Sequence, residues 1–263
     1  MRGGLFRHPG VRQVLLLLIP NALAMVGAYI GNIVDVSFTS YMQDVASLSA
    51  LHNAEMLQAL PAALIGQAVT QSLMPHLALQ ASAGRYVRMR QMAWKVIGVS
   101  ILLMLPTALL LVVLGKPTIY LLFQHGAFNA HATDLTNLAL IGYALALPGM
   151  AAGVLLSGAF FALKDAWTPF VTNTLNLGVR WGMLYLLFHA LPASMQVLAV
   201  PLALAIAVNS EAILLGLLLL FRLRRRIKLD RGMVRLLLRR QYQRRGATNS
   251  VVDIVAEQPV EGV

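Results

Sequence analysis

Long apolar runs dominate the chain, and short polar stretches separate them. We expect six of these runs to be transmembrane helices, because each is close to the roughly 20 residues that a helix needs to cross a bilayer. The runs are too long for barrel strands, and they lack the alternation of polar and apolar residues that such strands show. The expected spans cover residues 14–38, 57–77, 96–114, 138–161, 170–187 and 197–221. The pattern therefore predicts an all-α, polytopic membrane helix bundle.

The composition supports a membrane protein and excludes several other classes. Hydrophobic residues make up 58% of the chain and charged residues 12%, whereas a soluble domain would have about 25% charged residues. The absence of cysteine excludes disulfides and thiolate-bound metals. The histidines show no metal-ligand spacing, and there is no phosphate loop and no nucleophile at motif spacing from a base. We therefore expect no metal, no cofactor and no catalytic residue, so the protein is not predicted to be an enzyme.

Positive charge is concentrated on one side of the expected membrane topology. The net charge is +11, but 11 of the 21 Lys and Arg residues lie within residues 222–245, directly after the last apolar run. A basic cluster in that place is typical of a cytoplasmic flank that contacts anionic lipid headgroups rather than of a nucleic-acid site. In total, 19 of the 21 fall in segments assigned to the same side. This bias predicts that both termini are cytoplasmic.

The same patterns divide the chain into three parts. Residues 1–228 are expected to form one six-helix transmembrane lobe. Residues 229–245 are basic with an apolar stripe, which is typical of an amphipathic segment on the inner membrane surface. Residues 246–263 are polar and slightly acidic, so we expect a disordered tail.

Arg180 and Glu211 are charged residues deep inside the expected spans. Intramembrane charges cost about 2.5–3.5 kcal/mol each, so each is a candidate functional residue. Arg180 and Glu211 both lie roughly 16–18 Å from the inner surface at about 1.5 Å per residue. We expect them to face each other or a common polar cavity. They could form a structural ion pair, or Arg180 could be a substrate-facing cation tuned by the carboxylate.

Further polar residues extend this candidate cavity along the fifth span. Asn173, Asn176 and Arg180 follow one another at offsets of three and four, which places them on one helix face. Such a face points to a bundle interior or a water-filled cavity. The alternative is that these amides only form hydrogen bonds between helices, as is common in membrane bundles.

A second group of polar residues lies near the outer ends of the first two spans. Asp35 ends the first span, and Asn53 and Glu55 precede the second. The two carboxylates could bind a cation or a proton, or could simply lie near water. Together with the fifth- and sixth-span residues they complete the candidate substrate cavity.

One stretch carries a resemblance to a known family. Residues 121–169 read LLFQHGAFNAHATDLTNLALIGYALALPGMAAGVLLSGAFFALKDAWTP. The QHGAF turn with Gly126 and Phe128, and the Thr168-Pro169 helix start, resemble the second half of the lipid II flippase family (MurJ, also called MviN). The likeness runs from about residue 11 to 226, and Asp35 takes the place of an acid in the family's seventh helix.

The resemblance implies a fold and a function. It implies one lobe of a MurJ/MATE-like fold, within the multidrug, oligosaccharidyl-lipid and polysaccharide exporter superfamily. Such proteins are multi-pass in the bacterial cytoplasmic (inner) membrane and serve peptidoglycan biosynthesis, cell wall biogenesis and cell shape. They move lipid-linked peptidoglycan precursor, lipid II, across the membrane by alternating access between two lobes. Cavity cations would hold the substrate diphosphate.

The chain also departs from the family's pattern. Only one lobe is present, so we expect a component or fragment of a flippase that needs an N-terminal-lobe partner or self-association. Met56 follows Glu55 where the family often has Arg after an acid. An exporter of another lipid-linked glycan or of a drug, on the same fold, is therefore an alternative. A further alternative is a non-transporting membrane scaffold for cell-wall synthesis. The expected partners are membrane lipids and a lipid-linked glycan, not nucleic acid.

Overall fold

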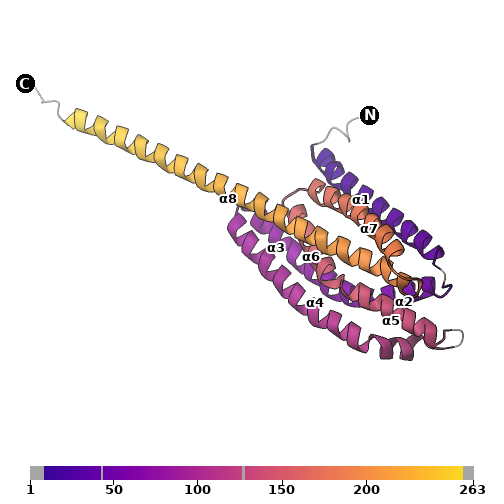
Figure 1. Cartoon of the computed structure of the whole chain (residues 1–263). Helices are drawn as coiled ribbons and strands as arrows, with labels where there is room; N and C mark the ends of the chain where they lie inside the picture. Colours follow the sequence, from indigo (N-terminus) through magenta and orange to yellow (C-terminus); the bar gives the residue numbers. More distant parts are fainter. Residues whose placement is uncertain (1–8, 43, 126–127, 257–263) are drawn as a thin grey trace, which may run out of the picture. The chain divides into compact units, whose positions relative to one another are not determined.

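The computed structural model describes residues 9–42, 44–125 and 128–256, and these residues are helical with short turns and no strands (Figure 1). The elements are α1 (Pro9–Ser40), α2 (Ser47–Pro61), η2 (Ala62–Gln67), α3 (Ala68–Ser82), α4 (Tyr86–Phe123), α5 (Ala130–Ala144), α6 (Leu147–Ala162), α7 (Trp167–Ala190), η3 (Ala193–Leu198) and α8 (Ala199–Ala256). The prediction of an all-α helix bundle is confirmed.

The expected spans coincide with these helices. The first, third and fifth lie in α1, α4 and α7, and the sixth begins in η3 and continues in α8. The second covers α2, η2 and α3, and the fourth covers α5 and α6. Among the described residues, Tyr86–Phe123 and Ala193–Ile227 are each long and apolar enough to cross a membrane, and the α5–α6 pair, bent by 42°, is a third candidate. The structure is thus a helical membrane bundle, while the count of six spans stays a prediction.

Proline explains the two breaks inside expected spans. Pro61 ends α2, and the next turn widens into the π-helix η2. A proline cannot donate a backbone hydrogen bond, and a wider turn accommodates the loss. Pro148 lies in the first turn of α6, where its missing N–H is tolerated. The chain therefore bends between α5 and α6 rather than continuing as one helix.

A short polar turn fixes the start of α7, which carries most of the candidate site. Lys164 adopts a left-handed backbone with φ of 59°, which ends α6. Asp165 then accepts hydrogen bonds through Oδ1 from the backbone N–H groups of Trp167 and Thr168, both at 3.1 Å. Its Oδ2 accepts from the Thr168 hydroxyl at 2.6 Å. A carboxylate that satisfies the free N–H groups of a first turn stabilises the helix start.

The chain divides into two compact units, Met1–Leu219 and Leu220–Val263. The boundary expected from the sequence was at residues 228 and 229, a few residues later within α8. The second unit is helical as far as Ala256, while the division at residue 229 and the disordered tail from residue 246 stay predictions. No proline occurs there before Pro259 to stop the helix. Residues 257–263, and the side chains of residues 229–245, lie outside what the structure describes.

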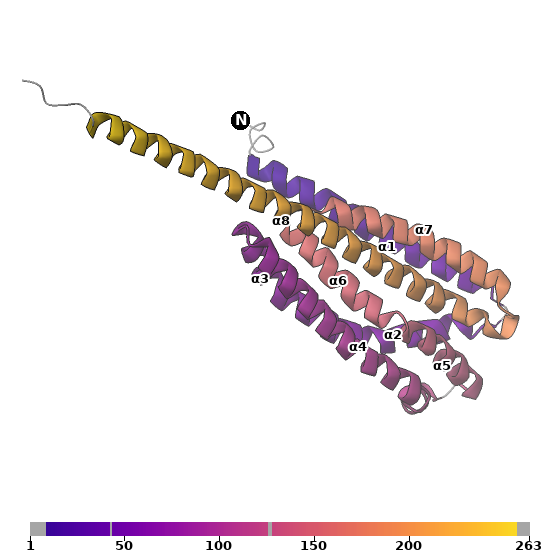
Figure 2. The same cartoon turned by 60° about the vertical axis from the view of Figure 1, so that its left-hand side comes forward.

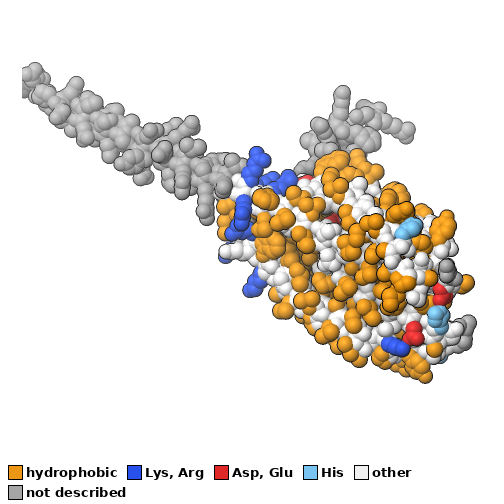
Figure 3. Space-filling view, viewed as in Figure 1, with side chains coloured by type: hydrophobic (Ala, Val, Ile, Leu, Met, Phe, Trp, Pro, Cys, Tyr) orange, Lys and Arg blue, Asp and Glu red, His pale blue; other side chains and the backbone are white. Residues whose placement is uncertain are grey.

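The first unit is held together by helix pairs that are distant in sequence. α1 lies beside α7, and α2 beside α5 (Figure 2). The core between α2, α5 and the start of α8 combines bulky Leu140 and Tyr143 with Ala50, Ala54 and Ala203, which let helices approach closely. Apolar side chains cover much of the visible outer face (Figure 3). This distribution is what a bundle surrounded by lipid requires.

Candidate functional site

A cavity of about 550 Å³ lies in the first unit between α1, α3, α6, α7 and α8. Its size falls within the roughly 300–1,000 Å³ that is usual for ligand sites. Its polar lining residues are Asn32, Thr70, Ser157, Asn173, Asn176, Arg180 and Glu211. The rest of the lining is glycine and apolar side chains, Met74, Val154 and Phe161 among them. One cavity therefore combines polar and apolar surface.

Arg180 forms an ion pair with Asp35 inside this bundle. Nη2 of Arg180 on α7 donates a hydrogen bond to Oδ2 of Asp35 on α1, and the exposed fractions of the two side chains are only 15% and 11%. An ion pair between Arg180 and Glu211 was one of the alternatives left open by the sequence, and the structure pairs Arg180 with Asp35 instead. α1 lies directly beside α7, so Asp35 reaches the guanidinium.

Glu211 has a different partner, one turn earlier on α7. Nδ2 of Asn176 donates a hydrogen bond to Oε2 of Glu211 on α8. Arg180 and Glu211 nevertheless both line the one cavity, together with Asn173 and Asn176. The expectation of a common cavity and of a single polar face on α7 agrees with this geometry. A role of these residues in substrate binding stays a prediction.

The candidates near the outer ends of the first two spans are not all brought to the cavity. Asp35 is engaged with Arg180. Glu55 is exposed and Asn53 is partly buried on α2, and neither lines the cavity. Among the described residues, no group of three or more His, Asp or Glu side chains could hold a metal ion. A cation or proton held between Asp35 and Glu55 stays a prediction.

The sequence did not point to the small residues that shape the cavity wall. A Cβ added to Gly149 would lie 2.8 Å from the backbone N of Asn209, so α6 and α8 touch there backbone to backbone. Nδ2 of Asn209 also donates to the carbonyl of Leu145 at 3.0 Å, at the bend between α5 and α6. A Cβ on Gly153 would meet nothing within 4 Å. The glycine and alanine run of residues 149–159 was the available signal, but it does not tell a packing glycine from a cavity-lining one.

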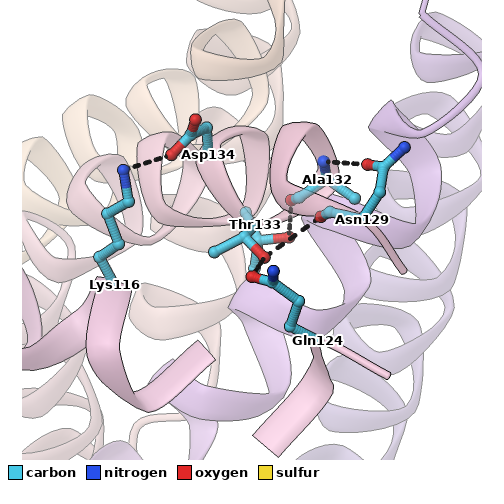
Figure 4. A network of polar contacts seen from close by, with 7 residues as sticks. Lys116, Gln124, Asn129, Ala132, Thr133 and Asp134 are labelled. Atoms are coloured by element: carbon cyan, nitrogen blue, oxygen red, sulfur yellow. Dashed lines mark hydrogen bonds and ion pairs between the residues drawn. The ribbon is translucent and has the colours of Figure 1, made fainter. Parts of the chain in front are cut away.

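A separate polar network lies where α4 meets α5 (Figure 4). Oδ1 of Asn129 accepts from the backbone N of Ala132 at 2.9 Å, which caps the start of α5. The Thr133 hydroxyl donates to Gln124 at 2.9 Å, and Nζ of Lys116 lies 2.6 Å from Asp134. None of these residues lines the cavity. Gly126, between Gln124 and Phe128, lies outside the described residues.

A histidine of α5 ties the α1–α2 turn to this end of the bundle. Nε2 of His131 lies 2.5 Å from Oδ2 of Asp44. Oδ1 of Asp44 accepts from the backbone N of Ala46 at 2.9 Å. The hydrogen bond with His131, and then the one from Ala46, lower the pKa of the Asp44 carboxyl below its ordinary value of 3.8.

Comparisons with known proteins agree on one family. A family model described as lipid II flippase MurJ matches residues 4–244. A probable lipid II flippase MurJ of Rhizobium meliloti is 27% identical over 186 residues, which are 71% of this chain and 34% of that protein. The lipid II flippase MurJ of Burkholderia cenocepacia is 31% identical over 166 residues, 62% of this chain and 31% of that protein.

A solved structure gives the same result for the fold. The chain is similar to a lipid II flippase MurJ in an inward closed conformation, with a TM-score of 0.66 and 24% sequence identity. The similarity covers 82% of this chain and 45% of the flippase. The chain spans about a third of the length of the curated relatives it matches.

Proposed function

The chain belongs to the lipid II flippase MurJ family, and we propose that it supplies one lobe of a transporter that moves lipid-linked peptidoglycan precursor across the cytoplasmic membrane. The observation that supports this proposal most is the cavity of about 550 Å³ in a helical membrane bundle. A polar headgroup that crosses an apolar bilayer needs such a lined path, because unsatisfied polar groups are costly in hydrocarbon.

The arrangement suits transport by binding and helix movement rather than by covalent chemistry. Asn173, Asn176 and Arg180 follow α7 and offer polar groups at successive depths. The π-helical turn after Pro61 and the α5–α6 bend are places where a helix changes direction with little loss of hydrogen bonding. In our proposal these breaks let the lobe tilt as access alternates between the two membrane faces.

We further propose that both termini are cytoplasmic. Arg85 immediately precedes α4, and Arg88, Arg90 and Lys95 lie within the first turns of that helix. The opposite end of the same helix carries Lys116, which is paired with Asp134. An excess of basic residues marks the cytoplasmic side of a membrane protein.

A second lobe completes the transporter in this proposal. The solved flippase is more than twice as long as the part that this chain matches, since the similarity covers 45% of it. An N-terminal-lobe partner or a second copy of this chain would supply the missing half of the transport path. We favour the N-terminal-lobe partner, because residues 121–169 of this chain resemble the second half of the family.

Genetic complementation tests this function. In a bacterium depleted of its own lipid II flippase, we expect growth when the chain is expressed with the N-terminal lobe of the Burkholderia cenocepacia relative. Rescue by this chain alone would favour self-association. Failure of both, with membrane insertion verified, would count against a flippase. If the chain is a scaffold, rescue of growth should require residues 222–263 and should survive Arg180→Ala. If it is a transporter, Arg180→Ala should abolish rescue. Asp134→Asn, in the α4–α5 network, should leave rescue by a transporter intact.

A further inference from the structure

The charged groups of the cavity are already engaged within the protein. The guanidinium of Arg180 is paired with Asp35, and Glu211 accepts a hydrogen bond from Asn176. Nε of Arg180 is buried and has no partner, so it cannot contact a ligand unless the helices rearrange. A phosphate that entered this cavity would have to compete with Asp35 for the guanidinium.

The charge balance of the cavity also opposes an anion. Among the lining residues, Arg180 contributes one positive charge and Glu211 one carboxylate. Asp35 is not part of the lining, but its carboxylate is paired with Arg180 and adds a second negative charge. With Glu211 ionised the three groups sum to one negative charge, and with Glu211 protonated they sum to zero. Among the residues that the structure describes, no other Lys, Arg or His is part of the lining. In neither state does the cavity offer the net positive charge that recognition of a phosphate or diphosphate requires.

The neutral polar groups of the lining, in contrast, are available to a ligand. Within the described part of the chain, the side chains of Asn32, Asn173 and Ser157 form no hydrogen bond to the protein. All three border the cavity, on α1, α7 and α6. Two amides and a hydroxyl can both donate and accept hydrogen bonds. The hydroxyl and amide groups of a sugar can also do both, so they can pair with these side chains.

The apolar part of the lining fits the same ligand chemistry. Met74, Phe161 and Leu177 border the cavity together with the free amides. An aromatic ring and a thioether provide a polarisable apolar surface that can contact the C–H faces of a sugar ring or the first carbons of a lipid chain. Gly153, whose added Cβ would meet nothing within 4 Å, leaves room against α6.

We propose that this cavity is a subsite for an uncharged, hydrogen-bonding glycan or amide group of an amphipathic ligand, and that it excludes the phosphates of that ligand. The inference deepens the proposed function, since the lipid-linked precursor would place its sugar and amide portion here and its diphosphate outside this lobe's cavity. The role expected for Arg180 changes accordingly. It is a positioning residue that holds α1 against α7 and sets the charge balance, rather than a phosphate ligand.

Binding of two simple probes to the full chain in nanodiscs tests this assignment. One probe is an alkyl N-acetylglucosaminide, which has hydroxyls and an amide but no phosphate. The other is farnesyl diphosphate, which has two phosphates and no sugar. We expect the glycoside to bind saturably and the diphosphate to bind at least about tenfold more weakly, because Arg180 is already paired with Asp35 and leaves no free cation for the phosphates. Tighter binding of farnesyl diphosphate than of the glycoside would overturn the proposal.

Variants separate the two parts of the claim. Asn173→Leu should weaken glycoside binding about threefold to tenfold, the loss expected for one net hydrogen bond. Asp35→Asn should free the guanidinium and raise affinity for farnesyl diphosphate about tenfold. If Asp35→Asn fails to fold, Glu211→Gln provides a second test, because removing the acid should also raise diphosphate affinity. Asp134→Asn, outside the cavity, should change neither probe. Unchanged binding of both probes in Asn173→Leu and Glu211→Gln would overturn the assignment.

The outcomes distinguish this inference from the proposed function. Glycoside binding with these variant effects, together with failed complementation, would leave the subsite in place and remove the flippase role. Successful complementation with preferential diphosphate binding would leave the flippase role and remove the subsite.

Discussion

Arg180 on α7 donates a hydrogen bond to Asp35 on α1, which lies 145 positions earlier in the chain. The pair joins two neighbouring helices at one edge of the cavity, and both side chains are largely buried. Neither charge would be tolerated alone in this environment, because an uncompensated charge in a bilayer is costly. The pair therefore fixes how α1 and α7 pack before any ligand binds.

Removing one partner of the Arg180–Asp35 pair should destabilise the folded protein more per charge than removing both partners together. Asp35→Asn and Arg180→Gln each leave one buried charge without its partner, and a loss of about 3–5 kcal/mol in the free energy of unfolding is expected for each. The double variant Asp35→Asn/Arg180→Gln should lose much less than the sum. Denaturant unfolding of the four proteins in detergent micelles, followed by tryptophan fluorescence, gives this comparison. Additive losses would show that the two groups are not coupled in the folded protein.

Sequence reasoning reached the polar face of α7 but not the pairing across helices. The offsets of three and four between Asn173, Asn176 and Arg180 are a local property of a helix, so that face was predictable. Which acid meets Arg180 depends on which helix lies beside α7. From the sequence, Asp35 was grouped with Glu55 near the outer ends of the first two spans, and only the helix arrangement brings it to Arg180.

The architecture of membrane helices was predictable because it, too, depends on local sequence. Apolar runs of helix length indicate membrane helices whatever their neighbours. The bend between α5 and α6 and the π-helical turn after Pro61 were not assigned. Proline marks a possible break, but whether the helix kinks, widens or restarts depends on the packing around it. The close contact at Gly149 likewise requires knowledge of the partner helix.

Glycine at position 149 should be required for the contact between α6 and α8. In Gly149→Ala the new Cβ would lie 2.8 Å from the backbone N of Asn209, so the helices must separate. We expect a loss of about 1–3 kcal/mol in unfolding free energy, as overpacking usually causes. Gly153→Ala is the matched control on the same helix, because nothing lies within 4 Å of its added Cβ. Equal stability of the two variants would show that this close approach is absent.

The contact between Asp44 and His131 should make stability depend on pH. His131 holds the pKa of the Asp44 carboxyl below its ordinary value of 3.8. The interaction therefore stabilises the folded state above that value and is lost as the pH falls through the lowered pKa. Asp44→Asn retains an oxygen for the Ala46 backbone N–H but loses the charge. Because the pair is exposed, its contribution is at most about 1 kcal/mol, or about 2–4 °C in melting temperature.

Thermal unfolding of the wild type and Asp44→Asn across pH checks this prediction. The difference should be present near pH 6 and should shrink as the pH is lowered below about 4, the ordinary range for an aspartate. In a His131→Gln background, Asp44→Asn should have little effect at any pH. The same difference in both backgrounds would assign the effect to something other than this contact.

The topology can be tested by single-cysteine labelling, since the natural chain contains no cysteine. Ala83 lies in the turn between α3 and α4, and Ala193 begins η3 between α7 and α8; both are exposed. With cytoplasmic termini, Ala193→Cys should react with a membrane-impermeant maleimide in intact spheroplasts. Ala83→Cys should react only after permeabilisation. The opposite labelling pattern would mean that the lobe has the inverted orientation in the membrane, with both termini outside the cytoplasm.

Reconstituted transport tests the central claim most directly. Proteoliposomes would contain this chain, the N-terminal lobe of a MurJ relative, both, or neither, with a fluorescent lipid II analogue in both leaflets. The fraction of the analogue that a membrane-impermeant quencher can reach, followed over time, measures movement of the analogue between the two leaflets. We predict that the two lobes together bring analogue from the inner leaflet to the outer one, and that Asp35→Asn or Arg180→Gln in this chain slows that movement. No movement above protein-free vesicles, with both lobes folded and associated, would contradict the account.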